Sequence, residues 1–310
     1  MPLERQVGEL VVLRFDGTAV PSYVRAILRR GWAAGAILFG DNIASPAQLR
    51  ALTRRLRAAS AQTPIIAADQ EGGTVRALPW APPVAAAAGQ RPGPDARAGA
   101  RALRAAGLNV ALAPVADLAR GPALASRSFG ADPRRVSAAV AAAVRGWRAG
   151  GVAPTVKHFP GLGRATANTD DAPVTLPAPT AADLAPFAAA VRAGVPLVMS
   201  DHARYPALDA AHIASQSDPI LEGLLRRRLG FRGVVMTDSM EAAAVRATGS
   251  LEQAAVRAIA AGNDIVLTTG RGSWIRVYRA LLERARADRG FRARVRESAA
   301  RVVALRRTLR

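Results

Sequence analysis

Lys157 and His158 are the first candidates for chemistry, because they end an apolar run and precede a turn containing proline and glycine. Lysine occurs only at position 157, whereas arginine occurs 42 times. An ammonium is a compact point charge and a guanidinium is a planar fork, so the one retained lysine indicates a role that arginine cannot fill. Chance survival under biased codon use is the alternative. The preceding run predicts a buried strand that delivers both side chains to a loop.

Carboxylates form the second candidate group. The chain has 23 acidic residues, and many of its aspartates closely follow an apolar run. These aspartates are Asp16, Asp41, Asp69, Asp117, Asp201 and Asp238. For any single one, a capping or turn-forming role is an equally good interpretation. As a set beside one Lys-His pair, they predict an acidic site for an uncharged polyhydroxyl ligand, and sugar hydrolysis uses paired carboxyl groups.

Clustered acids also bind metals, but the chain offers few other ligands. It has no cysteine, and its histidines, His158, His202 and His212, lie far apart without a His-Glu-x-x-His pattern. A metal site built from Asp201, His202 and their neighbours stays open as a minor alternative. The prediction is that the protein uses no metal and no cofactor.

The elements that would position these side chains are eight short apolar runs separated by helical patterns. The runs cover residues 10–14, 36–39, 64–68, 110–113, 154–156, 196–199, 234–236 and 264–267. Residues 79–94 are rich in proline, alanine and glycine and predict a long loop. Helix starts are marked by Ser45-Pro46, Asp132-Pro133, Thr180 with Asp183, Asp218-Pro219 and Ser250 with Gln253.

This alternation predicts an α/β fold, a single (β/α)8 TIM-type barrel that covers residues 1–310 as one domain. In such a barrel the carboxyl ends of the strands meet at one mouth, where active sites are built, so the aspartates would converge there. A doubly wound sheet is the alternative. It is disfavoured because no Gly-x-Gly-x-x-Gly turn follows the first predicted strand, and Gly161-Leu162-Gly163 lacks the third glycine and the Walker lysine.

The net charge of +20 would suit nucleic acid or an anionic surface. Residues 271–310 alone carry 13 arginines against Glu283, Asp288 and Glu297. These arginines alternate with apolar residues at helical spacing, which favours the solvated outer face of terminal helices, and we expect no nucleic-acid partner. The amino terminus has no signal pattern and no uncharged apolar run is long enough for a bilayer, so the expected location is the cytoplasm, away from membranes.

Four segments carry a joint pattern. They are Ala68-Asp69-Gln70-Glu71-Gly72-Gly73, Ser126-Arg127-Ser128-Phe129-Gly130, Lys157-His158-Phe159-Pro160-Gly161 and Phe231-Arg232-Gly233-Val234-Val235-Met236-Thr237-Asp238-Ser239-Met240. In order and separation these segments resemble glycoside hydrolase family 3, in its bacterial β-N-acetylhexosaminidase branch. The resemblance covers nearly the whole chain.

The resemblance implies that Asp238 is a nucleophile, which forms a covalent glycosyl-enzyme that water hydrolyses with net retention. It also implies that Asp69, Arg127, Lys157 and His158 hold sugar hydroxyls on the non-reducing side of the cleaved bond. Lysine and arginine donate to hydroxyl oxygens, and aspartate accepts from hydroxyl groups. A turn-forming role for Asp69 and a loop-ordering ion pair for Arg127 are the structural alternatives.

The chain departs from the family on the loop that follows the Lys-His segment. The family pattern continues with His-Gly, four residues and Asp-Ser-His, whose last histidine is the acid/base. Here Leu162 replaces the first histidine, and Asn168-Thr169-Asp170 stands where Asp-Ser-His is expected. Three accounts stay open. Asp170 is itself the acid/base, with a pKa raised by desolvation or by Asp171; Asp201 supplies the proton; or the chain binds a glycan and turns it over poorly.

The predicted function is a retaining β-glycoside hydrolase, a β-N-acetylglucosaminidase acting on a small carbohydrate or muropeptide derived from the cell wall, as in peptidoglycan recycling. Asp201 and His202 complete the predicted substrate site, and the oligomeric state stays open. A weak or inactive glycan-binding protein and a family 3 glycosidase of other sugar specificity are the alternatives. An anionic Asp170 would repel phosphate as a nucleophile, which favours hydrolysis over phosphorolysis.

Overall fold

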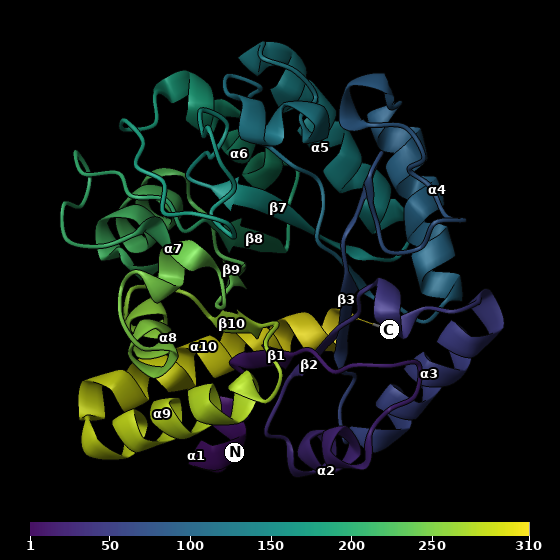
Figure 1. The fold of residues 1–310 in the computed structure, drawn as a ribbon, viewed down its shortest axis with the longest axis vertical. Helices are drawn as coiled ribbons and strands as arrows, with labels where there is room; N and C mark the ends of the chain where they lie inside the picture. Colours follow the sequence, from purple (N-terminus) through teal and green to yellow (C-terminus); the bar gives the residue numbers. More distant parts are fainter. Residues whose placement is uncertain (310) are drawn as a thin grey trace.

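Eight parallel strands close into a barrel in the computed structural model, which describes residues 1–309 (Figure 1). Around the barrel the strands follow the order β1-β10-β9-β8-β7-β6-β3-β2, and each neighbouring pair is parallel. All eight overlap the apolar runs of the sequence, so the predicted (β/α)8 barrel is confirmed. The strands are β1 (Val11–Leu13), β2 (Gly35–Ile37), β3 (Ile65–Ala68), β6 (Val110–Ala111), β7 (Ala153–Phe159), β8 (Leu197–Ser200), β9 (Val234–Ser239) and β10 (Ile265–Thr268).

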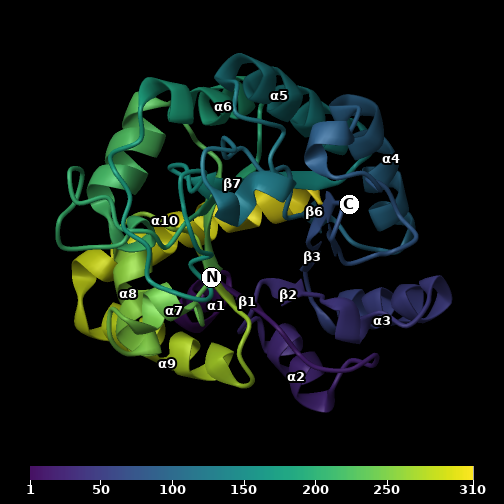
Figure 2. The ribbon, with the colours of Figure 1, turned by 45° about the horizontal axis from the view of Figure 1, so that its top comes forward.

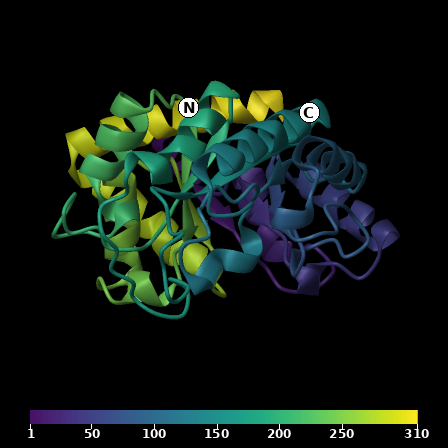
Figure 3. The ribbon, with the colours of Figure 1, turned by 90° about the horizontal axis from the view of Figure 1, so that it is seen from above.

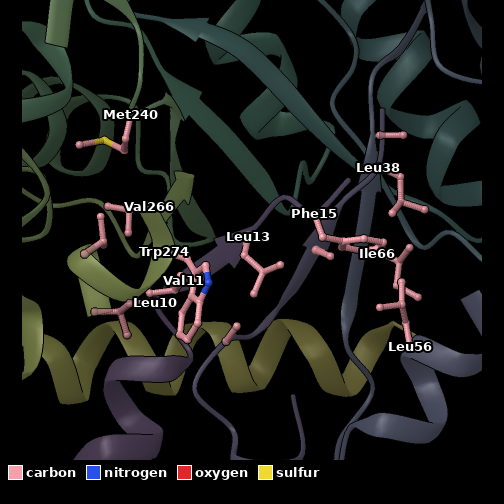
Figure 4. Packing of buried hydrophobic residues seen from close by; sticks show 14 of the residues in the cluster. Leu10, Val11, Leu13, Phe15, Leu38, Leu56, Ile66, Met240, Val266 and Trp274 are labelled. Carbon is pink, nitrogen blue, oxygen red and sulfur yellow. The ribbon is translucent and has the colours of Figure 1, made fainter. Parts of the chain in front are cut away.

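The strand side chains alternate between the inside and the outside of the barrel. The residues that fill the inside include Val12, Ile37, Ile65, Ala67, Val110, Leu112, Leu197, Met199, Val234, Met236, Ile265 and Leu267. The alternate residues pack against the helices, and Figure 4 shows Val11, Leu13 and Val266 in one such cluster with Trp274. Both faces of the strands are therefore buried, which explains why they are continuous apolar runs in the sequence.

Helices surround the strands in a ring (Figures 1 and 2). Ser45, Thr180 and Ser250 each accept a hydrogen bond from the amide three residues on, and Asp132 caps its helix, as the sequence predicts; Asp218 makes no such bond. The helices are α1 (Leu3–Gly8), α2 (Ser22–Arg30), α3 (Pro46–Ala59), α4 (Pro92–Ala105), α5 (Pro133–Ala149), α6 (Ala181–Arg192), a π-helix (Pro219–Arg228), α7 (Ala243–Arg246), α8 (Leu251–Ala260), α9 (Ser273–Ala287) and α10 (Arg289–Thr308).

The last helix, α10, closes the barrel at the amino ends of the strands. Val302, Leu305 and Leu309 pack with the side chains that fill the barrel, and in Figure 2 the helix passes behind the strands. Arg306 binds the Glu9 carboxylate at 2.5 Å and the carbonyl of Thr63 at 2.8 Å, and these two residues precede β1 and β3. Figure 3 shows the amino terminus and α10 on this side, and long loops on the opposite side of the barrel.

The arginines of the terminal helices are only partly a solvated face. Asp264 is fully buried, and it lies 2.9 Å from Arg294, 3.1 Å from Arg301 and 2.7 Å from Arg226. A buried carboxylate needs such partners, because it has lost its hydration. The predicted solvated face was therefore wrong for Arg294, Arg301 and Arg306, which turn inward to carboxylates from distant parts of the chain.

Long loops lie at the carboxyl ends of the strands. After β3, the short strands β4 (Gln70–Gly72) and β5 (Val75–Arg76) pair in an antiparallel ribbon. The predicted loop of residues 79–94 follows and is confirmed, except that it contains a short 3-10 helix (Ala87–Gly89) and that α4 already begins at Pro92. A second long loop, residues 160–180, joins β7 to α6. Within residues 1–309, no helix combines the length and the apolarity that a membrane span requires.

Candidate active site

Strand alternation directs Asp69, Lys157 and Asp238 toward the barrel axis at its mouth. Asp69 follows Ala67 by two residues, and Asp238 follows Met236 by two residues. Ala67 and Met236 both point into the barrel, so the two aspartates do as well. In β7, Val156 packs outward among the helices, so the next residue, Lys157, points inward. Asp69 and Asp238 stay partly exposed, at 28% and 20% of their side chains. Three separate strands thus supply one site that solvent can reach.

Lys157 lies between two carboxylates. Its Nζ is 2.5 Å from Asp69 Oδ1 and 2.5 Å from Glu71 Oε1, and Arg127 donates two hydrogen bonds of 2.8 Å to Glu71. Burial alone would lower the pKa of Lys157, but the carboxylates of Asp69 and Glu71 raise it. Burial alone would raise the pKa of Glu71, but Lys157 and Arg127 lower it to about 2. Lys157 and Glu71 therefore both stay charged at neutral pH although both are buried.

His158 is fixed by the buried carboxylate of Asp117. Asp117 Oδ2 lies 2.7 Å from the ring Nδ1 of His158 and accepts its backbone amide at 3.0 Å, while Oδ1 accepts the amide of Leu162 at 2.6 Å. The other ring nitrogen, Nε2, lies 3.4 Å from Arg127 Nη2 and 3.9 Å from Asp238 Oδ2. One carboxylate therefore orients both the imidazole and the start of the loop that follows it.

Asp238 is an ionised and partly exposed carboxylate. Its Oδ1 accepts the backbone amide of Ser239 at 2.8 Å. Burial alone would raise the pKa of Asp238, but His158, His202 and Lys157 outweigh burial and lower it below the usual value. A carboxylate in this state can attack an electrophilic carbon and form an ester.

Asp170 lies on the loop of residues 160–180, which is docked against α7. The amide of Ala243 donates to the Asp170 carbonyl at 3.0 Å, and the amide of Ala244 donates to the Thr169 carbonyl at 3.1 Å. The residue as a whole is exposed, but partial burial of its carboxyl group and the charge of Asp238 raise its pKa to about 6. Two carboxyl groups with pKa values pushed apart can divide the nucleophile and acid roles between them.

Asp201 and His202 are in the interior instead of at the site surface. Both are fully buried. Asp201 accepts hydrogen bonds from the Tyr205 hydroxyl at 2.6 Å and from a backbone amide at 2.9 Å, and burial raises its pKa well above the usual value. The His202 ring lies 2.8 Å from the Ser215 hydroxyl and 2.9 Å from the Ser239 carbonyl.

The geometry corrects what the sequence suggested for these two residues. All polar side-chain atoms of Asp201 and His202 have protein partners, so neither presents a free group to a ligand or a proton to a leaving group. His202 instead supports the backbone beside Asp238, because it binds the carbonyl of the next residue, and burial lowers the pKa of His202. The position of both residues after a strand end was predicted, but their inward partners were not.

Glu71 was not assigned to the site from the sequence, and Asp117 was predicted only as one of the aspartates at the barrel mouth, yet both organise the site. Glu71 joins Lys157 to Arg127, and Asp117 holds His158. The available signals were weak: Glu71 is a second acid beside Asp69 in an acid-poor chain, and Asp117 is one of several aspartates after apolar runs. Their partners come from other strands and loops, 41 residues away along the chain for Asp117 and His158.

The resulting cluster combines hydrogen-bond donors and acceptors at the barrel mouth. Within residues 1–309, no three histidine, aspartate or glutamate side chains are grouped so that they could hold a metal ion. Charged hydrogen-bonding groups of both signs suit a polyhydroxyl ligand, whose hydroxyls both donate and accept. The cluster consists of Asp69, Glu71, Arg127, Lys157, His158 and Asp238.

Comparison with known proteins gives concordant matches over most of the chain. A family model described as "Glycosyl hydrolase family 3 N terminal domain" matches residues 2–305. A β-hexosaminidase of Stenotrophomonas maltophilia (strain R551-3) is 36% identical over 277 residues, which span 83% of this chain and 82% of that protein.

Two solved structures have the same fold over 99% of this chain. A glycoside hydrolase family 3 β-N-acetylglucosaminidase from Paenibacillus sp. str. FPU-7 superposes with a TM-score of 0.94 at 32% identity, and this chain spans 62% of that longer one. A β-N-acetylhexosaminidase from Beutenbergia cavernae DSM 12333 superposes with a TM-score of 0.91 at 35% identity, and 98% of that chain is covered.

Proposed function

The chain belongs to glycosyl hydrolase family 3, and on this basis we propose that it is a retaining β-N-acetylhexosaminidase with Asp238 as nucleophile and Asp170 as acid/base. The observation that carries the proposal is the contrast between the two carboxyl groups. The pKa of Asp238 is lowered, whereas that of Asp170 is raised to about 6. At a mildly acidic pH, one group is therefore an anion that can attack and the other an acid that can donate a proton.

In the first step Asp238 attacks the anomeric carbon and forms an ester bond. The bond between that carbon and the glycosidic oxygen breaks, and Asp170 gives its proton to the departing oxygen. Esterification removes the charge of Asp238, which is one of the causes that raise the pKa of Asp170. The pKa of Asp170 therefore falls, and its carboxylate can take a proton from water as that water attacks the anomeric carbon. The ester bond between that carbon and Asp238 breaks in this second step, which restores the Asp238 carboxylate and the acid form of Asp170. The sugar leaves with its original configuration.

The remaining residues of the cluster would bind the sugar that is released. Asp69 is the acceptor that solvent reaches, while Lys157 and Arg127 are donors held in place by Glu71. His158 lies between this group and Asp238, so it can bind a hydroxyl near the reacting carbon. Fixed donors and acceptors of this kind orient the ring for attack and lower the entropic part of the barrier.

N-acetylglucosamine is the proposed sugar, because the relatives named above are β-hexosaminidases and β-N-acetylglucosaminidases. A cell-wall fragment, such as a muropeptide, is the proposed source. Water is the proposed nucleophile of the second step instead of phosphate. The carboxylates around the site would repel an anionic nucleophile, and Asp170 becomes one of them once it has lost its proton.

A turnover assay tests the proposal. The purified protein is assayed against 4-nitrophenyl β-glycosides of N-acetylglucosamine, glucose and xylose, with Asp238→Asn as the inactive control and with phosphate present or absent. The expected result is release of free N-acetylglucosamine that phosphate does not accelerate and that Asp238→Asn abolishes. Faster turnover of the glucoside or the xyloside would replace N-acetylglucosamine as the proposed sugar. A sugar phosphate product would show that phosphate, and not water, is the nucleophile of the second step. Saturable binding with no turnover of any glycoside would indicate a glycan-binding protein on the same barrel.

A further inference from the structure

A hollow of about 300 Å³ lies at the carboxyl ends of β1 and β10. Ligand sites in proteins begin at about this volume. The lining of the hollow comes partly from α2 and from the loop that joins β10 to α9, two segments from opposite ends of the chain. Figure 2 shows these two segments near one another. We refer to this hollow as the β1–β10 hollow. Its lining includes Arg14, Phe15, Asp16, Tyr23, Thr269 and Arg271.

The charges of the β1–β10 hollow already balance one another. Arg14 lies 3.5 Å from Asp16 and 3.4 Å from Asp41, and Arg271 lies 2.7 Å from Asp16. A strongly charged ligand would have to compete with these ion pairs, whereas a neutral polar ligand could use their free hydrogen-bonding positions. Arg271 offers such positions, because its side chain is 88% exposed and its ion pair with Asp16 is made through Nε.

The lining of the β1–β10 hollow also includes the exposed aromatic ring of Tyr23. Tyr23 is 47% exposed, and burial and the neighbouring Asp16 carboxylate raise the pKa of its phenol. The face of a pyranose ring carries C–H groups and packs on aromatic rings, while its edge carries hydroxyls. Thr269 of the lining is fixed by Glu241, whose Oε2 accepts the Thr269 amide at 2.7 Å and its hydroxyl at 2.9 Å. The hollow therefore offers an exposed aromatic ring beside charged side chains that can bind hydroxyl groups.

The β1–β10 hollow is connected to the nucleophile through neighbouring strands. β9, which carries Asp238, pairs with β10, and β10 pairs with β1. The hydroxyl of Thr269 in the hollow lies 2.6 Å from the hydroxyl of Ser239, the residue after Asp238. Two strand spacings correspond to about 10 Å, so a saccharide bound at Asp238 can extend into the hollow without leaving the barrel mouth.

We propose that the β1–β10 hollow is a saccharide subsite that holds an uncharged sugar residue on the leaving-group side of the cleaved bond, with the Tyr23 ring against the sugar face. This inference rests on the proposed function, because it assigns a second sugar to the same site. It makes the protein selective for a saccharide leaving group over a small aryl group. Arg14, Asp16 and Arg271 bind the hydroxyls of that second residue.

The test compares two substrates on matched variants. The ratio of kcat/KM for chitotriose to kcat/KM for 4-nitrophenyl β-N-acetylglucosaminide is measured for the unmodified protein, Tyr23→Ala and Tyr23→Phe. Tyr23→Ala is expected to lower the ratio about tenfold, or about 1.4 kcal/mol, whereas Tyr23→Phe retains the ring and the ratio. Arg271→Ala is expected to lower the ratio as well, and Arg279→Ala, an exposed arginine of α9 outside the hollow, serves as its control.

An unchanged ratio in both Tyr23→Ala and Arg271→Ala would overturn the subsite while leaving the hydrolase proposal intact. If the unmodified protein hydrolyses neither substrate, the function proposal fails, and chitotriose binding is then measured by calorimetry. In that case weaker binding by Tyr23→Ala than by Tyr23→Phe supports a saccharide site in the hollow, and equal binding by the two variants overturns it.

Discussion

Replacing Asp170 with asparagine tests the assignment of the acid/base, because this change removes the proton donor and keeps the size of the side chain. The pKa of Asp170 is raised to about 6, so at pH 7 about a tenth of the molecules carry the acid form. General acid catalysis contributes about 10²–10⁴-fold. Asp170→Asn is therefore expected to lower kcat/KM on chitobiose by about that factor, equivalent to about 3–5 kcal/mol of transition-state stabilisation.

The leaving group separates acid catalysis from other losses. A 2,4-dinitrophenyl leaving group needs no proton, so Asp170→Asn is expected to cost less than about tenfold on that glycoside. The two glycosides are assayed in parallel with Asp171→Asn, which removes the adjacent exposed acid. Asp171 is a lesser cause of the raised pKa of Asp170, so this control is expected to retain its activity. An equal loss on both glycosides in Asp170→Asn would refute acid catalysis by this residue.

The pH profile gives an independent readout of the same assignment. Because the acid form of Asp170 is the active one, kcat/KM on chitobiose is expected to fall as the pH rises through about 6. The lowered pKa of Asp238 places the acidic limb below the ordinary aspartate range. In Asp170→Asn the alkaline limb is expected to disappear. If the alkaline limb of the profile stays near pH 6 in Asp170→Asn, the limb reports the titration of another group.

Two further predictions concern the buried charges. Glu71→Gln removes the carboxylate partner of Arg127 and leaves Lys157 with Asp69 alone, so it is expected to lower the free energy of unfolding by about 3–5 kcal/mol, measured by urea denaturation. The folded-state pKa of Glu71 is lowered to about 2, so the ionised Glu71 contributes fully to the free energy of unfolding above about pH 4.5, and this contribution is lost as the pH falls toward 2. A free energy of unfolding that does not change over this pH range would count against the ion pairs. Asp264→Asn is expected to cost about 3–5 kcal/mol, because it leaves three arginines around a neutral amide, whereas the exposed Glu283→Gln should change stability by about 0.5 kcal/mol or less. Equal melting temperatures for these last two variants would contradict the buried network.

The barrel could be predicted from the sequence because its strands are buried on both faces and thus form unbroken apolar runs. The same logic placed Asp69 and Asp238 at the mouth, since each follows such a run. Lys157 was conspicuous as the one lysine in an arginine-rich chain. These signals are local, which is why a single sequence reveals them.

What could not be predicted depends on partners distant in the chain. Asp201 follows a strand just as Asp69 does, but the Tyr205 hydroxyl binds it in the interior. Arg306 has the spacing of a solvated helix face, but Glu9, near the other end of the chain, draws it inward. The positioning role of Asp117 likewise depends on where β7 places His158.

A covalent intermediate on Asp238 is the most direct test of the mechanism. The protein is incubated with a fluorinated N-acetylglucosaminyl donor that slows the second step, then digested and examined by mass spectrometry. The account predicts one added sugar on the peptide that contains Asp238, and none in Asp238→Asn. A sugar attached to another residue, or continued turnover of the donor with no adduct, would contradict it.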